Sequence, residues 1–361
     1  MKIMHVVGAR PNFMKISPLI REMDRFPKEF KQILIHTGQH YDNCMSEAFF
    51  NELGLPRPDV NLEVGSGSHA WQTAQIMLRF EKVVEEYKPD WVIVPGDVNS
   101  TLACALVCSK LGIKVAHLEA GLRSFDRSMP EEINRILTDQ VSELLFTPSL
   151  DGNDNLLREG VAPEKIHFVG NIMIDTLVRL LPLAEQRWPS FQEKFGLDRY
   201  ILITIHRPAN VDNPQSLQEI FSALLELSER WKIIFPVHPR TQNRLRGLGQ
   251  SGNAENLILL EPLGYLDFLA LEAHASSVVT DSGGVQEETS FLKIPCITVR
   301  PNTERPVTIH QGTNRLVKNK CLAIINAVED CLTNNRRGGK IPEFWDGKTA
   351  GRITAIFQNM I

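Results

Sequence analysis

Short runs of apolar, mostly β-branched residues alternate along this chain with longer stretches whose apolar positions recur at helical spacing. Most short runs are apolar on both faces of the strand that they predict, which is typical of strands covered by helices on both sides. Such alternation of strand and helix predicts parallel sheets joined by right-handed crossovers. The predicted strands are Ile3–Val7, Gln32–His36, Trp91–Pro95, Lys114–Leu118, Leu144–Thr147, Ile166–Val169, Tyr200–Ile205, Lys232–Val237, Leu257–Leu260, Ser277–Thr280 and Cys296–Val299.

The predicted strands fall into two series, the first ending at Ile166–Val169 and the second beginning at Tyr200–Ile205. A chain of 361 residues is too long for one ordinary core and suits two domains. We therefore expect an α/β protein with two Rossmann-like, doubly wound parallel-sheet domains that face each other across a cleft. The expected domains are residues 1–170 and 171–361, and the terminal helical pattern Thr349–Ile361 is a candidate for packing back on the first domain.

The composition of the chain limits the kinds of binding partner that we expect. Hydrophobic residues make up 43% of the chain and charged residues 23%, as in ordinary globular proteins. The net charge is −4 without a basic stripe, so we expect neither nucleic acid nor a membrane as a partner. The six cysteines are scattered without a Cys-x-x-Cys pair, which favours free thiols over a metal site and indicates a reducing compartment, the cytoplasm.

The unusual residues of the first half follow its predicted strands, where open parallel sheets bind their ligands. Arg10 and Lys15 follow the first strand beside a predicted helix N-terminus, whose unpaired N–H groups favour an anion. An ordinary strand–helix turn with surface cations would give the same segment. No Gly-x-Gly-x-x-Gly motif is present, so hydride transfer with a nicotinamide cofactor is not supported.

Three carboxylates come after later strands of the same half. Asp97 has an alternative explanation as a helix cap, and Glu119 as one partner of an internal ion pair with Arg123. Glu131 lies in a first helical turn, where the helix dipole alone favours an acidic residue. Because the strand ends of one sheet converge, we expect all three to meet. Crowded carboxylates raise one another's pKa values, which suits general acid–base catalysis.

The second half carries cations and small residues at corresponding positions. His206 and Arg207 follow a strand and indicate an anion site or a proton carrier. The turn Ser282–Gly284 precedes a predicted helix, and its small residues let backbone N–H groups approach a phosphate. Further candidates at this edge are His238, Glu288, Arg300 and Arg305.

In their order and spacing, these motifs resemble those of the non-hydrolysing UDP-N-acetylglucosamine 2-epimerase family. They are Gly8–Pro11 with Lys15, Gly96-Asp97, His117–Arg123, Pro130–Glu132, His206-Arg207, Asp281–Gly284 with Glu288, and Thr303–Pro306. The resemblance extends over nearly the whole chain. It implies the two-domain fold of B-type glycosyltransferases (GT-B), with UDP held mainly by the second domain.

The resemblance also implies a role for each candidate residue. Asp97, Glu119 and Glu131 are expected to surround the sugar and transfer protons, together with His206. The remaining residues are expected to bind the substrate. Arg10 and Arg305 are expected at the diphosphate together with His206, while Ser282, Gly283 and Gly284 are expected at a phosphate and Glu288 at the ribose. Further expected substrate contacts are Lys15, Arg123, His238 and Phe268. No cofactor and no metal are implied, and the expected assembly is a homodimer.

The reaction implied by the resemblance is the reversible conversion of UDP-N-acetylglucosamine into UDP-N-acetylmannosamine through a 2-acetamidoglucal. Two alternatives keep the elimination step, a hydrolysing 2-epimerase and a 2-epimerase of a modified UDP-sugar such as a 2,3-diacetamido uronic acid. A GT-B glycosyltransferase is the alternative from another class.

Tyr41 and Asp42 depart from the pattern of a second UDP-sugar site in regulated bacterial members, and Leu263 stands where relatives often place glutamine near the uracil.

Overall fold

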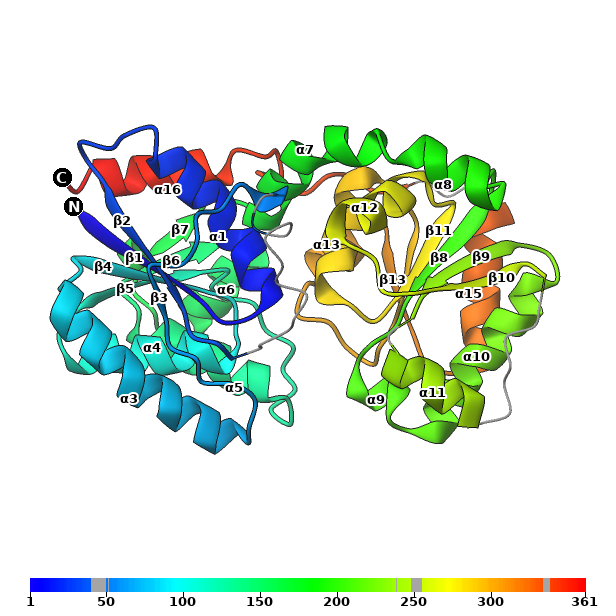
Figure 1. Cartoon of the computed structure of the whole chain (residues 1–361), viewed down its shortest axis with the longest axis horizontal. Helices are drawn as coiled ribbons and strands as arrows, with labels where there is room; N and C mark the ends of the chain where they lie inside the picture. The colour runs from blue at the N-terminus through cyan, green and yellow to red at the C-terminus, as the bar shows by residue number, and fades with distance from the viewer. Residues whose placement is uncertain (40–49, 51, 238, 248–254, 334–337) are drawn as a thin grey trace. The chain divides into compact units, whose positions relative to one another are not determined.

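The computed structural model describes residues 1–39, 50, 52–237, 239–247, 255–333 and 338–361. They form two compact units, Met1–Thr176 together with Glu343–Ile361, and Leu177–Pro342 (Figure 1). The boundary that we predicted after residue 170 falls instead between residues 176 and 177, inside helix α7 (Ile172–Glu185). The last residues return to the first unit, so the second unit ends before the C-terminus.

The first unit is built on a seven-stranded parallel sheet with the order β3-β2-β1-β4-β5-β6-β7. Its strands are β1 (Lys2–Val7), β2 (Lys31–His36), β3 (Val60–Asn61), β4 (Trp91–Pro95), β5 (Lys114–Leu118), β6 (Leu144–Thr147) and β7 (Ile166–Phe168). Its helices are α1 (Arg10–Met23), α3 (His69–Tyr87), α4 (Asn99–Lys110), α5 (Pro130–Val141), α6 (Leu150–Arg158), the 3₁₀ turn η1 (Pro163–Lys165) and α16 (Thr349–Gln358). Figure 1 shows α3, α4 and α5 on one face of the sheet and α1 and α16 on the other. The central strand β4 is buried at every position because both of its faces are covered.

The C-terminal segment is part of the first core. The Phe357 ring of α16 makes edge contacts with Trp91 and Phe146, at centroid distances of 5.5 and 5.9 Å. The Trp345 indole N–H donates to the carbonyl oxygen of Pro148 at 2.9 Å. The apolar spacing of the final segment is therefore explained by packing against the first sheet, as we expected.

The second unit is built on a six-stranded parallel sheet with the order β10-β9-β8-β11-β12-β13. Its strands are β8 (Tyr200–Thr204), β9 (Lys232–Pro236), β10 (Leu257–Leu260), β11 (Ser277–Thr280), β12 (Cys296–Val299) and β13 (Asn314–Val317). Its helices are α8 (Trp188–Phe195), α9 (Pro208–Val211), α10 (Pro214–Ser228), α11 (Pro239–Gly247), α12 (Tyr265–His274), α13 (Gly283–Leu292), α14 (Val307–His310) and α15 (Cys321–Thr333).

Two edge strands were missed by the sequence pattern. β3 has only two residues, Val60 and Asn61, and pairs with the end of β2. β13 contains Asn314 and the exposed Arg315, and the Asn314 side-chain oxygen accepts a hydrogen bond from Thr298 at 2.6 Å. Neither strand has the continuous apolar run that marked the predicted strands, because β3 is very short and β13 carries two polar residues.

Each sheet reverses its strand order beside its first strand. β1 lies between β2 and β4, and β8 lies between β9 and β11. Ligands of open α/β sheets bind where the order reverses, beyond the carboxyl ends of the strands. The loops after β1, β4 and β5, and those after β8, β11 and β12, therefore define where each unit should bind a ligand. None of the helices described here is long and apolar enough to cross a bilayer.

Candidate functional site

The loop after β5 places Glu119 beside the N-terminal half of α1. Glu119 has a φ angle of 72°, which is uncommon for a residue other than glycine and typical of functional loops. Its Oε2 atom lies 2.5 Å from Nζ of Lys15, and both side chains are largely buried. Its Oε1 atom is buried without a hydrogen-bond partner in the described part of the chain. A buried polar atom without a partner needs a physical reason, and contact with a bound substrate would supply one.

The ion pair that Glu119 makes in the structure differs from the one that we considered from the sequence. That alternative paired Glu119 with Arg123, its neighbour along the chain, whereas the structure pairs it with Lys15 across a sequence separation of 104 residues. Gly96, at the end of β4, has a φ angle of 67°, and a Cβ atom there would lie 2.9 Å from Nζ of Lys15. The lack of a side chain at Gly96 therefore leaves room for the Lys15–Glu119 pair.

Asp97 follows Gly96 and is paired with α5. Nη2 of Arg135 lies 2.5 Å from Oδ2 of Asp97, and Nε lies 3.2 Å from the same oxygen. Nη1 of Arg135 lies 2.5 Å from Oε2 of the buried Glu132. The Asp97 side chain keeps 28% of its surface exposed, which makes it accessible to a ligand as well as anchored.

Glu131 lies on a different side of α5 from its buried neighbour. Its side chain is exposed and lines a pocket of about 270 Å³ together with His69, Gln72, Asn99 and Asn134. We expected Glu131 to meet Asp97 and Glu119, but the acidic residue of α5 that the structure ties to Asp97 through Arg135 is Glu132. The first helical turn explains both acidic residues locally, so only the tertiary contact separates their roles.

Arg123, which we expected among the substrate-binding residues, is buried in the first unit. Its guanidinium group is buried and donates to both oxygens of Glu159, at 2.8 and 2.6 Å, and to the carbonyl oxygen of Leu122 at 2.7 Å. It also lies 2.8 Å from Oδ2 of Asp139. Burial opposes its charge, but Glu159 and Asp139 raise the pKa of Arg123 above its ordinary value. These contacts give Arg123 a role in holding the loop after β5.

His117, on β5, connects this ion cluster to the Gly96–Asp97 turn. Its Nδ1 atom lies 2.6 Å from Oδ1 of Asp139, and its Nε2 atom lies 2.7 Å from the carbonyl oxygen of Gly96. A carbonyl oxygen only accepts, so Nε2 carries a proton. His117 therefore holds the backbone immediately before Asp97.

One face of α5 supplies the anchors of both loops. Glu132, Arg135 and Asp139 are spaced three and four residues apart, so they lie along the same side of the helix. Sequence reasoning missed all three, together with the role of His117. The signal was present as charged residues at helical spacing on a face that also carries the buried Thr138.

In the second unit, Asp281 holds the loop that follows β8. Its carboxylate accepts the backbone N–H groups of His206 at 3.1 Å and Arg207 at 2.9 Å, and the Asn210 side-chain amide at 3.0 Å. Nδ1 of His206 lies 3.2 Å from the same carboxylate, and its side chain is 58% exposed. The His206 ring is thus oriented by Asp281 while remaining accessible.

A cluster of arginines surrounds the N-terminus of α13. Arg305 lies 2.8 Å from Glu287 and also contacts Glu304, which accepts from Arg300 at 2.7 Å and lies 3.8 Å from Arg207. Burial, followed by the nearby Arg300, lowers the pKa of Arg207. Repulsion among these cations, beside the free N–H groups of a helix start, favours the binding of an anion.

The helix start itself requires small residues. A Cβ atom on Gly283 would lie 2.6 Å from Nη1 of Arg305. Ser282 is the N-cap residue of α13, and Gly283 and Gly284 begin the helix. The structure thus brings Ser282, Gly283 and Arg305 together, as the sequence suggested.

The other residues that we predicted for the site lie at several separate places in the chain's two units. Glu288, in the second turn of α13, is buried and accepts a hydrogen bond from the Tyr265 hydroxyl at 2.7 Å. Phe268 is partly buried and packs, like Leu263, against the core cluster beside β11. Arg10 is exposed at the first position of α1. His238, Tyr41 and Asp42 lie outside the described residues.

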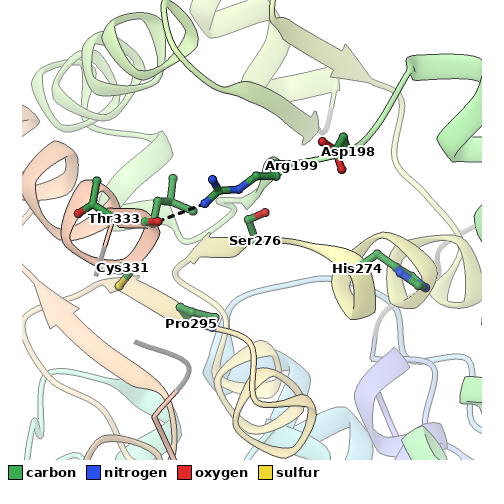
Figure 2. A pocket seen from close by; sticks show the side chains of 8 residues that line it. Asp198, Arg199, His274, Ser276, Pro295, Cys331 and Thr333 are labelled. Atoms are coloured by element: carbon green, nitrogen blue, oxygen red, sulfur yellow. Dashed lines mark hydrogen bonds between the residues drawn. The ribbon is translucent and has the colours of Figure 1, made fainter. Parts of the chain in front are cut away.

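A pocket of about 580 Å³ lies elsewhere in the second unit (Figure 2). Asp198, Arg199, Ser276 and Pro295 line it, each just before a strand of the sheet. The pocket therefore opens at the amino-terminal edge, opposite the loops described above, and contains none of the residues that we predicted for the site. Its size alone assigns it no function.

Comparison with known proteins identifies close relatives. The family model described as UDP-N-acetylglucosamine 2-epimerase matches residues 21–358. A UDP-N-acetylglucosamine 2-epimerase of Methanococcus maripaludis is 45% identical, with 98% of each chain covered. A UDP-2,3-diacetamido-2,3-dideoxy-D-glucuronate 2-epimerase of Pseudomonas aeruginosa is 42% identical, with 88% of each chain covered.

The fold is shared with a solved structure. The Methanocaldococcus jannaschii UDP-GlcNAc 2-epimerase, crystallised with UDP-GlcNAc and UDP, has a TM-score of 0.91 and 46% identity, covering 99% of this chain and 100% of the other. Together with the two parallel sheets, this similarity confirms the GT-B-like fold class that we expected.

Proposed function

This chain belongs to the UDP-N-acetylglucosamine 2-epimerase family, and on that premise we propose that it interconverts UDP-N-acetylglucosamine and UDP-N-acetylmannosamine without hydrolysis. The observation that carries the proposal is the pairing of two kinds of site in one chain. The first unit offers anchored carboxylates, Asp97 and Glu119, and the second offers an arginine cluster at a helix start.

The proposed reaction begins with an elimination. A carboxylate takes the C2 proton of the sugar, the electron pair of that C–H bond forms the C1–C2 double bond, and UDP leaves C1 with the electrons of the C1–O bond. The product is a 2-acetamidoglucal. A proton is then returned to the opposite face of C2 and UDP adds back to C1, so that only the configuration at C2 has changed.

The chemistry needs two contributions that the described residues are suited to make. Proton removal and return require bases and acids on both faces of C2, and we propose Asp97 and Glu119 for them, with Glu131 and His206 as further candidates. The leaving diphosphate gains negative charge, and Arg305, Arg10 and the start of α13 are proposed to stabilise it. The proposed route needs no redox cofactor, because none of its steps, elimination, proton return or re-addition of UDP, oxidises or reduces the sugar.

Glu288 and Phe268 are proposed to hold the nucleoside, and Lys15 to keep Glu119 in place. Arg123, which we first expected at the substrate, is reassigned to the support of the loop after β5. A homodimer in the cytoplasm serving polysaccharide biosynthesis completes the proposal. It is supported by the family resemblance and the scattered cysteines.

A modified UDP-sugar is the second candidate substrate. The observation that favours it is the 42% identity with the Pseudomonas aeruginosa enzyme, whose name specifies a 2,3-diacetamido glucuronate. The elimination at C2 would be unchanged, and the difference would lie in the groups that contact C3 and C6.

Proton NMR in deuterated water tests the proposed reaction directly. We expect UDP-N-acetylglucosamine to acquire deuterium at C2 while UDP-N-acetylmannosamine accumulates toward equilibrium, because the returned proton comes from solvent. Free N-acetylmannosamine with UDP would identify a hydrolysing enzyme. No exchange at C2, followed by exchange in UDP-2,3-diacetamido-2,3-dideoxy-D-glucuronate, would assign the modified sugar. If neither substrate exchanges its C2 proton, the proposal is refuted.

A matched pair of variants tests the support of Asp97 by His117. A glutamine amide can replace the Nε2–H donor to the Gly96 carbonyl, whereas an asparagine amide reaches only toward Asp139. We expect His117→Asn to lower kcat by about 10²-fold and His117→Gln by less than about 10-fold, as misplaced catalytic groups do. KM should stay nearly constant in both variants. Equal losses in both, at equal thermal stability, would contradict the support of Asp97.

A further inference from the structure

Glu272, on α12, is a carboxyl group in an unusual place. Its exposed fraction is 0%, and neither of its oxygens has a hydrogen-bond donor among the described residues. An ionised carboxylate in such surroundings has lost its hydration without any compensation. Burial, and then the neighbouring Glu288, raise the pKa of Glu272 well above its ordinary value. These surroundings favour the protonated form of the Glu272 carboxyl group.

The polar group beside Glu272 is the carboxyl group of Glu288, one helix away on α13. Two carboxyl groups hydrogen-bond to each other only when one of them carries a proton, because ionised carboxylates only accept. Glu288 already accepts a hydrogen bond from the Tyr265 hydroxyl at 2.7 Å. A protonated Glu272 supplies a second donor to the same group. Burial raises the pKa of Glu288 to about 7, and the hydrogen bonds with Tyr265 and Glu272 act in the opposite direction by lowering it.

The other ionisable groups around the pair do not compete for this proton. On α12, burial raises the pKa of Tyr265 well above its ordinary value. On α13, Glu287 lies 2.8 Å from Arg305, and Arg179 of α7 is the nearby cation. On the sheet side, burial raises the pKa values of Tyr200 and Cys296, and the Tyr200 hydroxyl donates to the Leu271 carbonyl. These two groups are neutral near neutral pH.

We propose that Glu272 is a buried proton donor that holds Glu288 in its ionised, ribose-binding form. The inference rests on the proposed function, in which Glu288 contacts the ribose. Glu272 and Tyr265 each donate to Glu288, which leaves further lone pairs of that carboxylate for the ribose hydroxyl groups. Glu272 acts only through Glu288 and is a positioning residue, since it has no exposed surface with which to touch a ligand.

The proposal predicts a pH dependence with a definite sign. Once Glu288 is ionised, loss of the proton that remains on Glu272 leaves two adjacent buried carboxylates that repel each other, so UDP affinity should fall as pH rises into the alkaline range. The same proton affects stability. The pKa of Glu272 is higher in the folded chain than its model value of 4.5, so the folded state binds more protons than the unfolded state above that value. Its contribution to stability is therefore lost progressively as pH rises from there toward the folded pKa.

Titration calorimetry with UDP at several pH values tests the proposal. Glu272→Gln keeps a donor for Glu288 but has no proton to lose. We expect it to bind UDP like the wild type near neutral pH and to keep that affinity at alkaline pH, where the wild type weakens. Glu272→Leu removes the donor, and we expect UDP affinity to fall by about 10-fold near neutral pH. Glu193→Gln, the same chemical change at an exposed position of α8, should retain the wild-type pH profile.

The outcome separates this inference from the proposed function. If Glu272→Gln retains the alkaline loss of UDP affinity, or Glu272→Leu binds UDP as the wild type does, the shared proton is refuted while the epimerase proposal stands. If the wild type binds no UDP, the proposed function fails. Infrared spectroscopy then tests the proton itself. A carboxylic-acid C=O band must be present in the wild type and lost in Glu272→Gln, and its absence from the wild type would overturn the inference.

Discussion

Asp97→Asn is expected to lower kcat for C2 epimerisation by about 10²–10⁴-fold, the range typical of a lost acid–base group, with UDP affinity nearly unchanged. Asparagine has the shape of aspartate and keeps an oxygen that accepts from Arg135, so the contact with α5 is retained. What it loses is the ability to take a proton. UDP binding is nearly unchanged because the groups proposed for UDP, apart from Arg10, belong to the second unit.

Deuterium exchange at C2 and calorimetry with UDP are the measurements for this variant. Asp154→Asn, at an exposed position of α6, is the matched control and should retain full activity. A variant that no longer binds UDP would show that Asp97 supports the fold instead. Undiminished exchange at C2 would remove Asp97 from proton transfer. Glu119→Gln is a less clean test, because it leaves the buried Lys15 without a carboxylate partner.

Arg305→Ala is expected to weaken UDP binding by about 10²-fold, as truncation of a buried charge partner does, and to slow the elimination. The Arg305 guanidinium group lies against Gly283 at the start of α13. Its loss also leaves Glu287 and Glu304 with one cation fewer, which adds repulsion toward a diphosphate. Turnover should fall too, since charge on the leaving UDP is no longer stabilised.

Calorimetry with UDP and with uridine distinguishes a diphosphate contact from a general loss of the site. We expect the difference between the two ligands to shrink in Arg305→Ala, because only UDP carries the phosphates. Arg315→Ala is the control, an exposed arginine on β13 paired with Asp330 in the same unit. Wild-type UDP affinity in Arg305→Ala, with an intact thermal transition, would refute the diphosphate role.

The central strands could be predicted from the sequence because their signal is local. β4, β5 and β6 have the bounds that their apolar runs predicted, since a strand covered on both faces is mostly apolar. The polar residues at strand ends were visible for the same reason. Any residue that interrupts such a run marks the carboxyl edge, where parallel sheets bind ligands. The fold class and most candidate residues followed from these two rules and the family resemblance.

The partners of the charged residues could not be predicted, because they come from distant parts of the chain. Lys15 pairs with Glu119 rather than leaving Glu119 to its neighbour Arg123, and Arg123 is held by Asp139 and Glu159. Along the sequence, Glu131 and Glu132 are equivalent first-turn acids, yet only Glu132 is buried against Arg135. A charged side chain pairs with an opposite charge that lies close to it in space, and these distances are set only when the helices pack.

Glu272 shows the same division between sequence and structure. In the sequence it is one polar residue in a largely apolar helix, with nothing to separate it from a solvated position. Only the packing of α12 and α13 buries it beside Glu288 and makes its protonation state important. The sequence by itself determined where strands, helices and ligand-binding edges lie, because those depend on local hydrophobic patterning. Tertiary structure alone decided which ionisable groups are desolvated and paired, because desolvation and Coulomb energies depend on distances through space.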